Sequence, residues 1–242
     1  MLSLHNDSLR LSAVLHLPST RPCPAVLLAH GYGGNKIGYR RRYVHLARLL
    51  AERGIATLRL DQRGSGDSDG LFSEISIEGL VSDLLLGYGF LESHPSITTI
   101  GMLGSSFGAP LAIRTAAKAP VQSLALWAGL ADGALWLSEW KGSQEALEDH
   151  FRCGEEGPPL QLLEEFKALR SDVEAASLGV PLFSAHGERD PVVAISHQEA
   201  YRRARPDGTF LKFPKSDHAF RDEGERAQLL EATASWFQKT LL

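Results

Sequence analysis

The stretch that decides the fold is GSSFG at residues 104–108, which follows the apolar run ITTIGML at residues 97–103. The β-branched and aliphatic side chains of that run predict a buried strand. An alanine-rich helical pattern begins at Phe107, so the pentapeptide lies where a strand turns into a helix. A G-x-S-x-G motif in this position is typical of a nucleophile elbow, the tight turn that lifts a serine Oγ atom out of a sheet.

The two glycines of the motif have a physical reason. Gly104 and Gly108 stand two residues before and two residues after Ser106. At both places the backbone of such an elbow passes so close to its neighbours that a Cβ atom would clash, and the serine is held in a strained conformation. We therefore predict that Ser106 is a nucleophile at the tip of this turn.

Composition sets the outer limits of the interpretation. The chain has 242 residues, of which 43% are hydrophobic and 22% are charged, and its formal net charge is −4. This length can bury a large single core, so we expect residues 1–242 to form one domain. The charge gives no electrostatic basis for nucleic acid or an anionic membrane as a partner. We expect the local basic run Arg40–Arg42 to lie on the solvated face of a helix start.

The cysteines and the amino terminus bear on the compartment. Cys23 and Cys153 are the only cysteines, and two free thiols are typical of a reducing environment. Residues 1–17 contain interspersed polar and charged residues, unlike a signal peptide, and no apolar run is long enough to span a bilayer. We expect a soluble, cytoplasmic protein. No His or Cys spacing typical of metal ligands occurs, so we expect no metal and no cofactor. The sequence does not indicate the oligomeric state.

Strand patterns alternate with helical patterns along the chain. This alternation predicts an α/β fold with a mostly parallel sheet of eight strands and helices on both faces. We expect strands at residues 3–5, 9–17, 25–29, 55–60, 97–103, 121–127, 180–185 and 209–213, the first two forming an antiparallel pair. We expect helices at residues 43–53, 77–92, from 107 onward, 143–151, 160–169 and 225–241.

One segment, residues 130–179, is longer than an ordinary connection between strands. It contains the large apolar residues Trp136, Trp140, Phe151 and Phe166. The segment could be a crossover that only packs on the surface, or a small cap whose aromatic residues line a substrate pocket. It falls where loops open at the carboxyl edge of the sheet, so we favour the cap. We predict that at least one of Trp136, Trp140 and Phe151 lines the pocket.

A serine nucleophile needs a base, and the base needs an acid that orients it. After Ser106 the chain offers Asp190 just past one expected strand and His218 just past the next, in the order expected for a nucleophile elbow. We predict Asp190 as the acid, with Asp132 as the alternative, and His218 as the base. Asp217, the neighbour of His218, is interpreted as solvated or structural.

The reaction also needs donors for the negative charge of the tetrahedral intermediate. The backbone N–H of Phe107, at the amino end of the expected helix, is one candidate. The loop HGYGG at residues 30–34 supplies the other, and we predict the backbone N–H of Tyr32. His30 and His186 each precede a glycine at a strand end, and we expect both to hydrogen-bond nearby loops.

Five motifs carry a resemblance to the α/β-hydrolase superfamily: HGYGG (30–34), DQRGSGDS (61–68), GSSFG (104–108), HGERDPVV (186–193) and SDHAF (216–220). The chain resembles the small serine esterases and serine peptidase-like members of that superfamily, which include feruloyl and cinnamoyl esterases. The resemblance covers the chain except the expected cap, and it implies the α/β-hydrolase fold. One departure is Ser105, where many relatives have histidine.

On the matching positions, the resemblance implies Ser106, Asp190 and His218 as the catalytic residues and Tyr32 and Phe107 as the oxyanion donors. The function expected first is a serine carboxylester hydrolase that acts on small to medium, and also aromatic, esters through an acyl-enzyme. A peptidase, thioesterase or acyltransferase with the same triad is the alternative. A binding protein that keeps the fold without turnover is the third hypothesis.

Overall fold

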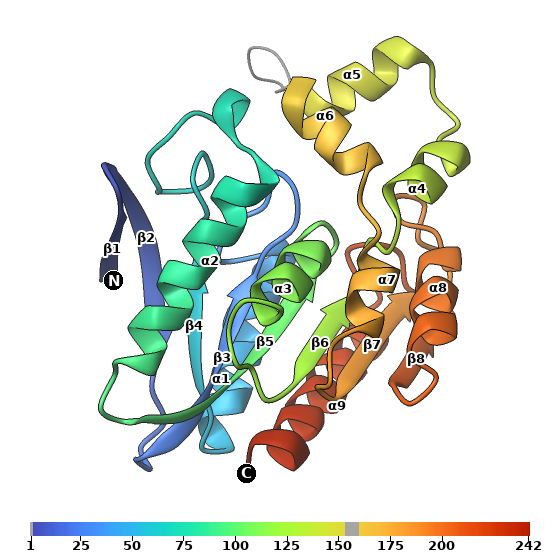
Figure 1. Ribbon diagram of the computed structural model, residues 1–242. Helices are drawn as coiled ribbons and strands as arrows, with labels where there is room; N and C mark the ends of the chain where they lie inside the picture. The colour runs from blue at the N-terminus through green and yellow to red at the C-terminus, as the bar shows by residue number, and fades with distance from the viewer. Residues whose placement is uncertain (1, 153–159) are drawn as a thin grey trace.

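The computed structural model describes the backbone of residues 2–152 and 160–242, and the side chains of these residues except 144, 150–152, 160 and 161. Within this part of the chain, eight strands form one sheet in the order β1-β2-β4-β3-β5-β6-β7-β8 (Figure 1). The strands β1 and β2 pair antiparallel with their neighbours, and the other strands pair parallel. Their bounds are β1 Leu2–Asn6, β2 Leu9–His16, β3 Cys23–Ala29, β4 Ala56–Leu60, β5 Ile97–Ser105, β6 Leu124–Trp127, β7 Leu182–Gly187 and β8 Thr209–Phe213.

Helices cover the two faces of the sheet. They are α1 Arg42–Glu52, α2 Ile77–Glu92, α3 Gly108–Ala116, α4 Gly133–Glu139, α5 Gln144–Arg152, α6 Leu160–Lys167, α7 Ser171–Ala176, α8 Ser196–Ala204 and α9 Glu223–Leu241, with 3-10 turns at Tyr39–Arg41 and Phe72–Glu74. Alternate residues of β3 serve two separate cores, because side chains alternate across a strand. Leu27 packs in the core under α2 and α3, whereas Val26 and Leu28 pack in the core under α1 and α9.

The predicted α/β fold with a mostly parallel sheet of eight strands is confirmed. The helices at α4, α7 and α8 were not predicted. In α8 the buried positions include the polar residues His197 and Gln198 beside Ala200 and Tyr201, so its apolar stripe is too thin to reveal a helix. None of the helices in the residues described here has the length and apolar character needed to span a bilayer.

The segment between β6 and β7 holds four of these helices. Figure 1 shows α4, α5 and α6 together beyond the carboxyl ends of the central strands, whereas α7 lies beside the sheet. The helix α7 packs against α3 and α8, so the last part of the segment belongs to the body of the fold. A covering role for α4 to α6 stays a prediction. Cys153 lies outside the described residues.

Candidate active site

Ser106 occupies the tight turn between β5 and α3. Its φ angle is 57°, in the left-handed region that costs an ordinary residue strain energy. A Cβ atom on Gly104 would lie 2.4 Å from the carbonyl oxygen of Gly108, and one on Gly108 would lie 2.3 Å from that of Ala29. Both distances are far below normal contact, so the turn can be built only with glycine at these two positions, as the sequence predicts.

His218 approaches Ser106 from the loop after β8. Its Nε2 atom lies 2.9 Å from Oγ of Ser106, and its Nδ1 atom lies 2.7 Å from Oδ2 of Asp190. An ionised carboxylate can only accept, so Nδ1 carries the hydrogen and Nε2 is left to accept the hydrogen of the serine hydroxyl. The structure thus brings together the three side chains that the sequence predicts, each just past the end of a different strand.

Asp190 is held firmly by its own loop. Its Oδ1 atom accepts hydrogen bonds from the backbone N–H groups of Val192, at 2.8 Å, and Val193, at 2.9 Å. Burial alone would favour the neutral acid. His186 and His218 beside the carboxylate, and the backbone of Val193, outweigh burial and hold the pKa of Asp190 well below its usual range. The group is therefore ionised at neutral pH.

The other acidic candidates are used elsewhere. Asp132 caps α4 by accepting from the backbone N–H of Leu135 at 2.8 Å, and it pairs with Arg170 at 3.0 Å. Asp217 accepts from the backbone N–H groups of Ala219 and Arg221, each at 3.1 Å. Both carboxylates thus stabilise local structure, and the carboxylate that contacts His218 in this structure is that of Asp190.

The loop after β3 passes directly over the serine. A Cβ atom on Gly31 would lie 3.0 Å from Cβ of Ser106. The carbonyl oxygen of Gly31 faces Nδ1 of His30 at 2.9 Å and accepts from the N–H of Gly34 at 3.0 Å. In a trans peptide the N–H points opposite to the C=O, so these two donors also fix the direction of the Tyr32 N–H.

His30 has both ring nitrogens engaged. Its Nε2 atom accepts from the backbone N–H of Gln62 at 3.1 Å, and Nδ1 therefore carries the hydrogen that faces the carbonyl of Gly31. Burial lowers the pKa of His30. The prediction that His30 bonds nearby loops is confirmed. His186 also bonds a nearby loop, because its Nε2 atom faces the carbonyl oxygen of Val193 at 2.8 Å.

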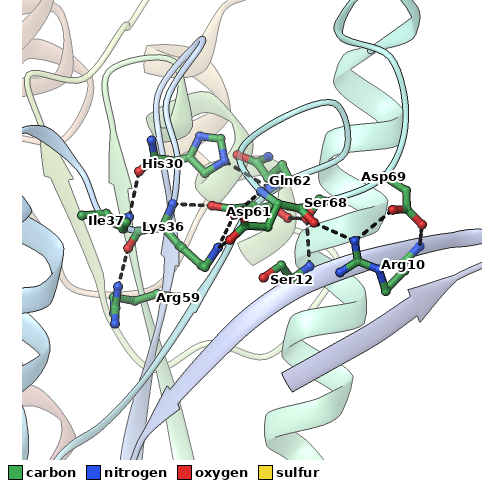
Figure 2. Close-up of polar contacts among 12 residues, drawn as sticks. Arg10, Ser12, His30, Lys36, Ile37, Arg59, Asp61, Gln62, Ser68 and Asp69 are labelled. Carbon is green, nitrogen blue, oxygen red and sulfur yellow. Dashed lines mark hydrogen bonds and ion pairs between the residues drawn. The ribbon is translucent and has the colours of Figure 1, made fainter. Parts of the chain in front are cut away.

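A second set of contacts fixes the loop after β3 to the loop after β4 (Figure 2). Asp61 is fully buried and accepts from the backbone N–H of Lys36 at 2.6 Å and from that of Asp67 at 2.9 Å. The ammonium of Lys36 forms ion pairs with the carboxylates of Asp61 and Asp67. The loop at residues 61–68 is thus a structural support for the loop that carries Tyr32.

One expectation from the sequence is wrong. Of the basic run, Arg40 and Arg41 are exposed, but Arg42 is only 8% exposed. Two successive residues with positive φ, Arg40 at 47° and Arg41 at 61°, turn the chain so that Arg42 points inward. Its Nη2 atom donates to Oγ of Ser105 and to the hydroxyl of Tyr43, each at 3.1 Å.

Two cavities lie beside these groups. A small cavity of about 40 Å³ touches Ser106 and is otherwise lined by Tyr32, Phe107, Leu130, Trp136, Phe166, Val192 and Val193. A larger groove of about 820 Å³ includes Trp136, Trp140, Glu139, Asp190 and Val192 in its lining. Of the three aromatic residues predicted for the pocket, Trp136 lines both cavities and Trp140 lines the groove. The side chain of Phe151 lies outside the described residues.

The sequence did not indicate Leu130, Val192 or Val193 as lining residues, and Phe166 was noted only as one of the aromatic residues of the expected cap. The valines belong to the motif that supplies Asp190, and Phe166 lies in a helix that was predicted. The sequence therefore contains these residues in recognisable elements, but it does not show where their side chains point. In the part of the chain that the structure describes, no group of three His, Cys, Asp or Glu side chains could hold a metal ion.

A family model and several curated proteins are similar to this chain. A family model described as "Serine aminopeptidase, S33" matches residues 20–135. The uncharacterized peptidase YuxL of Bacillus subtilis is 22% identical over 247 residues, which cover 90% of this chain and 35% of that protein. A putative phosphoribosyl transferase of Mycobacterium tuberculosis is 26% identical over 222 residues, which cover 90% of this chain and 41% of that protein. The chain spans less than half the length of these relatives.

Solved structures match over almost the whole chain. Est1E from Butyrivibrio proteoclasticus superposes with a TM-score of 0.83 at 18% identity, covering 99% of this chain and 98% of that chain. Its form described as having ferulic acid bound gives a TM-score of 0.82 at 19% identity, covering 99% of both chains. The esterase domain of a Rhodothermus marinus protein gives 0.73 at 22% identity, covering 98% and 97%. At these identities the likeness shows a shared fold.

Proposed function

We propose that this chain is a serine carboxylester hydrolase of the α/β-hydrolase superfamily. The family model that matches residues 20–135 and the fold shared with the esterase domain from Rhodothermus marinus support this proposal. The observation that carries the proposal is the unbroken line of contacts from Ser106 Oγ through His218 to Asp190. A serine hydroxyl becomes a nucleophile when a neutral imidazole can take its hydrogen, and a buried carboxylate both selects that tautomer and stabilises the imidazolium that forms.

In the proposed reaction, Oγ of Ser106 attacks the ester carbonyl carbon while its hydrogen passes to Nε2 of His218. The carbonyl oxygen becomes negatively charged and accepts hydrogen bonds from the backbone N–H groups of Tyr32 and Phe107. His218 then gives the proton to the leaving alcohol, and an acyl-enzyme remains. Water, deprotonated by His218, then attacks the acyl carbon. The bond to Oγ breaks, the carboxylic acid leaves, and the proton returns from His218 to Oγ of Ser106.

The small cavity that touches Ser106 favours an ester in which the group that enters this cavity is small or flat. Aromatic rings dominate its lining: Phe107 and Phe166 have centroids 6.1 Å apart in a stacked arrangement, and the rings of Trp136 and Phe166 are 5.1 Å apart. Such walls bind planar apolar groups by dispersion and ring contacts. The ferulic acid named for Est1E supports including aromatic esters among the candidates. In this proposal α4 and α6 act as a cap, because they supply Trp136 and Phe166.

A serine peptidase is the second candidate function. The description of the matching family model as a serine aminopeptidase and the name of the relative YuxL favour it. Thioesterase and acyltransferase activity would use the same groups. A binding protein without turnover is the weakest hypothesis, since three residues distant in sequence meet at hydrogen-bond distance in the order that catalysis requires.

The test is covalent labelling followed by a substrate panel. A fluorophosphonate should label the wild-type protein at Ser106, as located by mass spectrometry, and should not label Ser106→Ala. The control Ser93→Ala, which changes an exposed serine after α2, should label normally. Turnover of p-nitrophenyl esters of increasing chain length, methyl ferulate and aminoacyl anilides should then favour the esters. Ser106→Ala should lower kcat by about 10⁶-fold. Absence of labelling at Ser106 would contradict the proposal. A preference for the anilides would instead identify the protein as a peptidase.

A further inference from the structure

Arg42 is a buried cation with only neutral partners. Its guanidinium lies 5.0 Å from the ring centroid of Tyr43, and its Nη2 atom donates to the hydroxyls of Tyr43 and Ser105. Its Nε and Nη1 atoms are buried and have no hydrogen-bond partner among the described residues. No carboxylate in that part of the chain forms an ion pair with it, unlike the buried Lys36 with Asp61.

This arrangement is costly for folding alone. Removing a charge from water costs several kcal/mol, and neutral partners return only part of that cost. Replacing a buried ion pair by apolar residues of similar volume is often neutral or stabilising, and Arg42 lacks the partner charge that such a pair would have among the described residues. An arginine at this position therefore points to a role outside stability.

The position of the charge indicates the role. Ser105, which accepts from Arg42, directly precedes Ser106 and is 1% exposed. Its strand neighbour is Trp127, whose carbonyl oxygen accepts from the N–H of Ser106 at 2.8 Å. The ring of Trp127 in turn stacks on Tyr43 at 6.1 Å. The guanidinium thus lies directly behind the turn that presents the nucleophile, on the side of the sheet opposite to α3.

We infer that Arg42 is a positioning residue for the reaction at Ser106, which fixes Ser105 beneath the nucleophile and supplies a positive charge that stabilises the transition state. This inference rests on the proposed function. An ester is neutral in the ground state, and its carbonyl oxygen becomes negative only in the transition state. His218 becomes an imidazolium in the same step, but it approaches from the loop after β8, whereas Arg42 contacts the turn that carries the oxyanion donor Phe107. We therefore assign the effect of this buried, fixed cation to the oxyanion, where it favours the transition state over the bound substrate.

The test compares variants that separate charge, hydrogen bonding and packing. Arg42→Met removes the charge and keeps an apolar stem. Arg42→Gln is neutral and can still donate to Ser105, and Arg42→Lys keeps the charge. Arg41→Met is the matched control, since it removes the same charge from an exposed neighbour. For each variant we would measure the rate of fluorophosphonate labelling at Ser106, kcat and KM for p-nitrophenyl acetate, and the thermal midpoint.

We expect Arg42→Met and Arg42→Gln to lower both the labelling rate and kcat by about 10- to 100-fold, somewhat less than the loss of a direct oxyanion donor. KM should stay within about twofold, because binding of the neutral ester is not affected. Arg42→Lys should recover most of kcat, and Arg41→Met should match the wild type. The thermal midpoint of Arg42→Met should be unchanged or higher.

Three outcomes overturn the inference. Wild-type labelling and kcat in Arg42→Met would show that the charge does not act on the reaction. A lower thermal midpoint or failure of Arg42→Met to fold, with no recovery of kcat in Arg42→Lys, would show a structural role only. If the wild-type protein is not labelled at Ser106, the proposed function itself fails and the inference fails with it, a result distinct from labelling that is indifferent to Arg42.

Discussion

The imidazole of His218 and the carboxylate of Asp190 meet at a distance of 2.7 Å between Nδ1 and Oδ2. The other oxygen of this carboxylate is fixed by the backbone N–H groups of Val192 and Val193. Because each oxygen has its own set of donors, the carboxylate cannot rotate without losing hydrogen bonds, and its orientation sets the tautomer of His218.

Asp190→Asn should therefore lower kcat by about 10⁴-fold. The carbonyl oxygen of the new amide would stay with the two backbone N–H groups, so its NH₂ group would face His218. Nδ1 would then have to accept, Nε2 would carry the hydrogen, and the imidazole could no longer take the proton of Ser106. Steady-state turnover of p-nitrophenyl acetate checks this.

Asp132→Asn is the control for that measurement. Asparagine is also a good helix N-cap, so this variant should keep near wild-type kcat and lose only the ion pair with Arg170. A larger loss of kcat in Asp132→Asn than in Asp190→Asn would identify Asp132, which follows β6, as the acid.

The second prediction concerns the glycine at the start of α3. Gly108→Ala should destabilise the fold by more than about 2 kcal/mol, or prevent folding, because a Cβ atom 2.3 Å from a backbone oxygen forces the elbow to shift. The control is Gly89→Ala within α2, where a Cβ atom would meet nothing within 4 Å. Alanine there should stabilise by about 0.5–1 kcal/mol.

Urea unfolding monitored by circular dichroism gives both values. Equal effects of the two substitutions would mean that the close approach at Gly108 does not determine the fold. A mild effect of Gly108→Ala with full activity would also contradict the account of the elbow given above.

The sequence predicts the features that are encoded locally. The elbow, the order of Ser106, Asp190 and His218, and the sheet with most of its helices follow from strand ends, glycines and hydrophobic periodicity. Residues 130–179 were recognisable as an insertion because of length alone. These features depend on neighbours in sequence, so one chain is enough to find them.

Other features depend on tertiary packing and could not be predicted. Arg42 differs from Arg40 and Arg41 only through the turn that points it inward, and a run of three arginines does not show which one is buried. Phe166 and Phe151 have similar signals in two predicted helices, but the direction of each side chain depends on how its helix packs. The helix α8 was not predicted because part of its buried face is polar.

The third prediction tests the wall of the small cavity. Phe166→Ala should enlarge the space beside Ser106 and raise kcat/KM for p-nitrophenyl hexanoate relative to acetate by about tenfold or more, since one methylene in an apolar pocket is worth about 1–3 kcal/mol. Leu162→Ala is the matched control, because Leu162 is buried in the same helix but does not line the cavity. It should lower the thermal midpoint without changing the ratio. The same ratio in both variants would make Phe166 a packing residue.

The fourth prediction concerns pH and His197, which is fully buried at the start of α8. Its Nδ1 atom accepts from the backbone N–H of Ala131 at 3.1 Å, so Nε2 carries the hydrogen and faces Oε2 of Glu139 at 3.5 Å. Burial lowers the pKa of His197 to about 4, although Glu139 acts in the opposite direction.

An unfolded histidine titrates near pH 6.5. Between about pH 6.5 and about pH 4 the unfolded chain therefore binds more protons than the folded chain, and the free energy of unfolding falls as the pH falls. The slope from this residue is at most about 1.4 kcal/mol per pH unit. His30 acts in the same direction, because burial also lowers its pKa, so part of the slope remains when His197 is replaced.

His197→Asn keeps an acceptor for the Ala131 N–H and removes the titrating group. Its free energy of unfolding in urea should therefore fall less between pH 7 and pH 5 than that of the wild type. His5→Asn, which changes an exposed histidine, should retain the wild-type pH dependence. Working at pH 5 and above keeps the measurement clear of Asp190, whose lowered pKa places its contribution in more acidic solution. If His197→Asn and the wild type lose the same free energy over this range, His197 is not the source of the acid sensitivity.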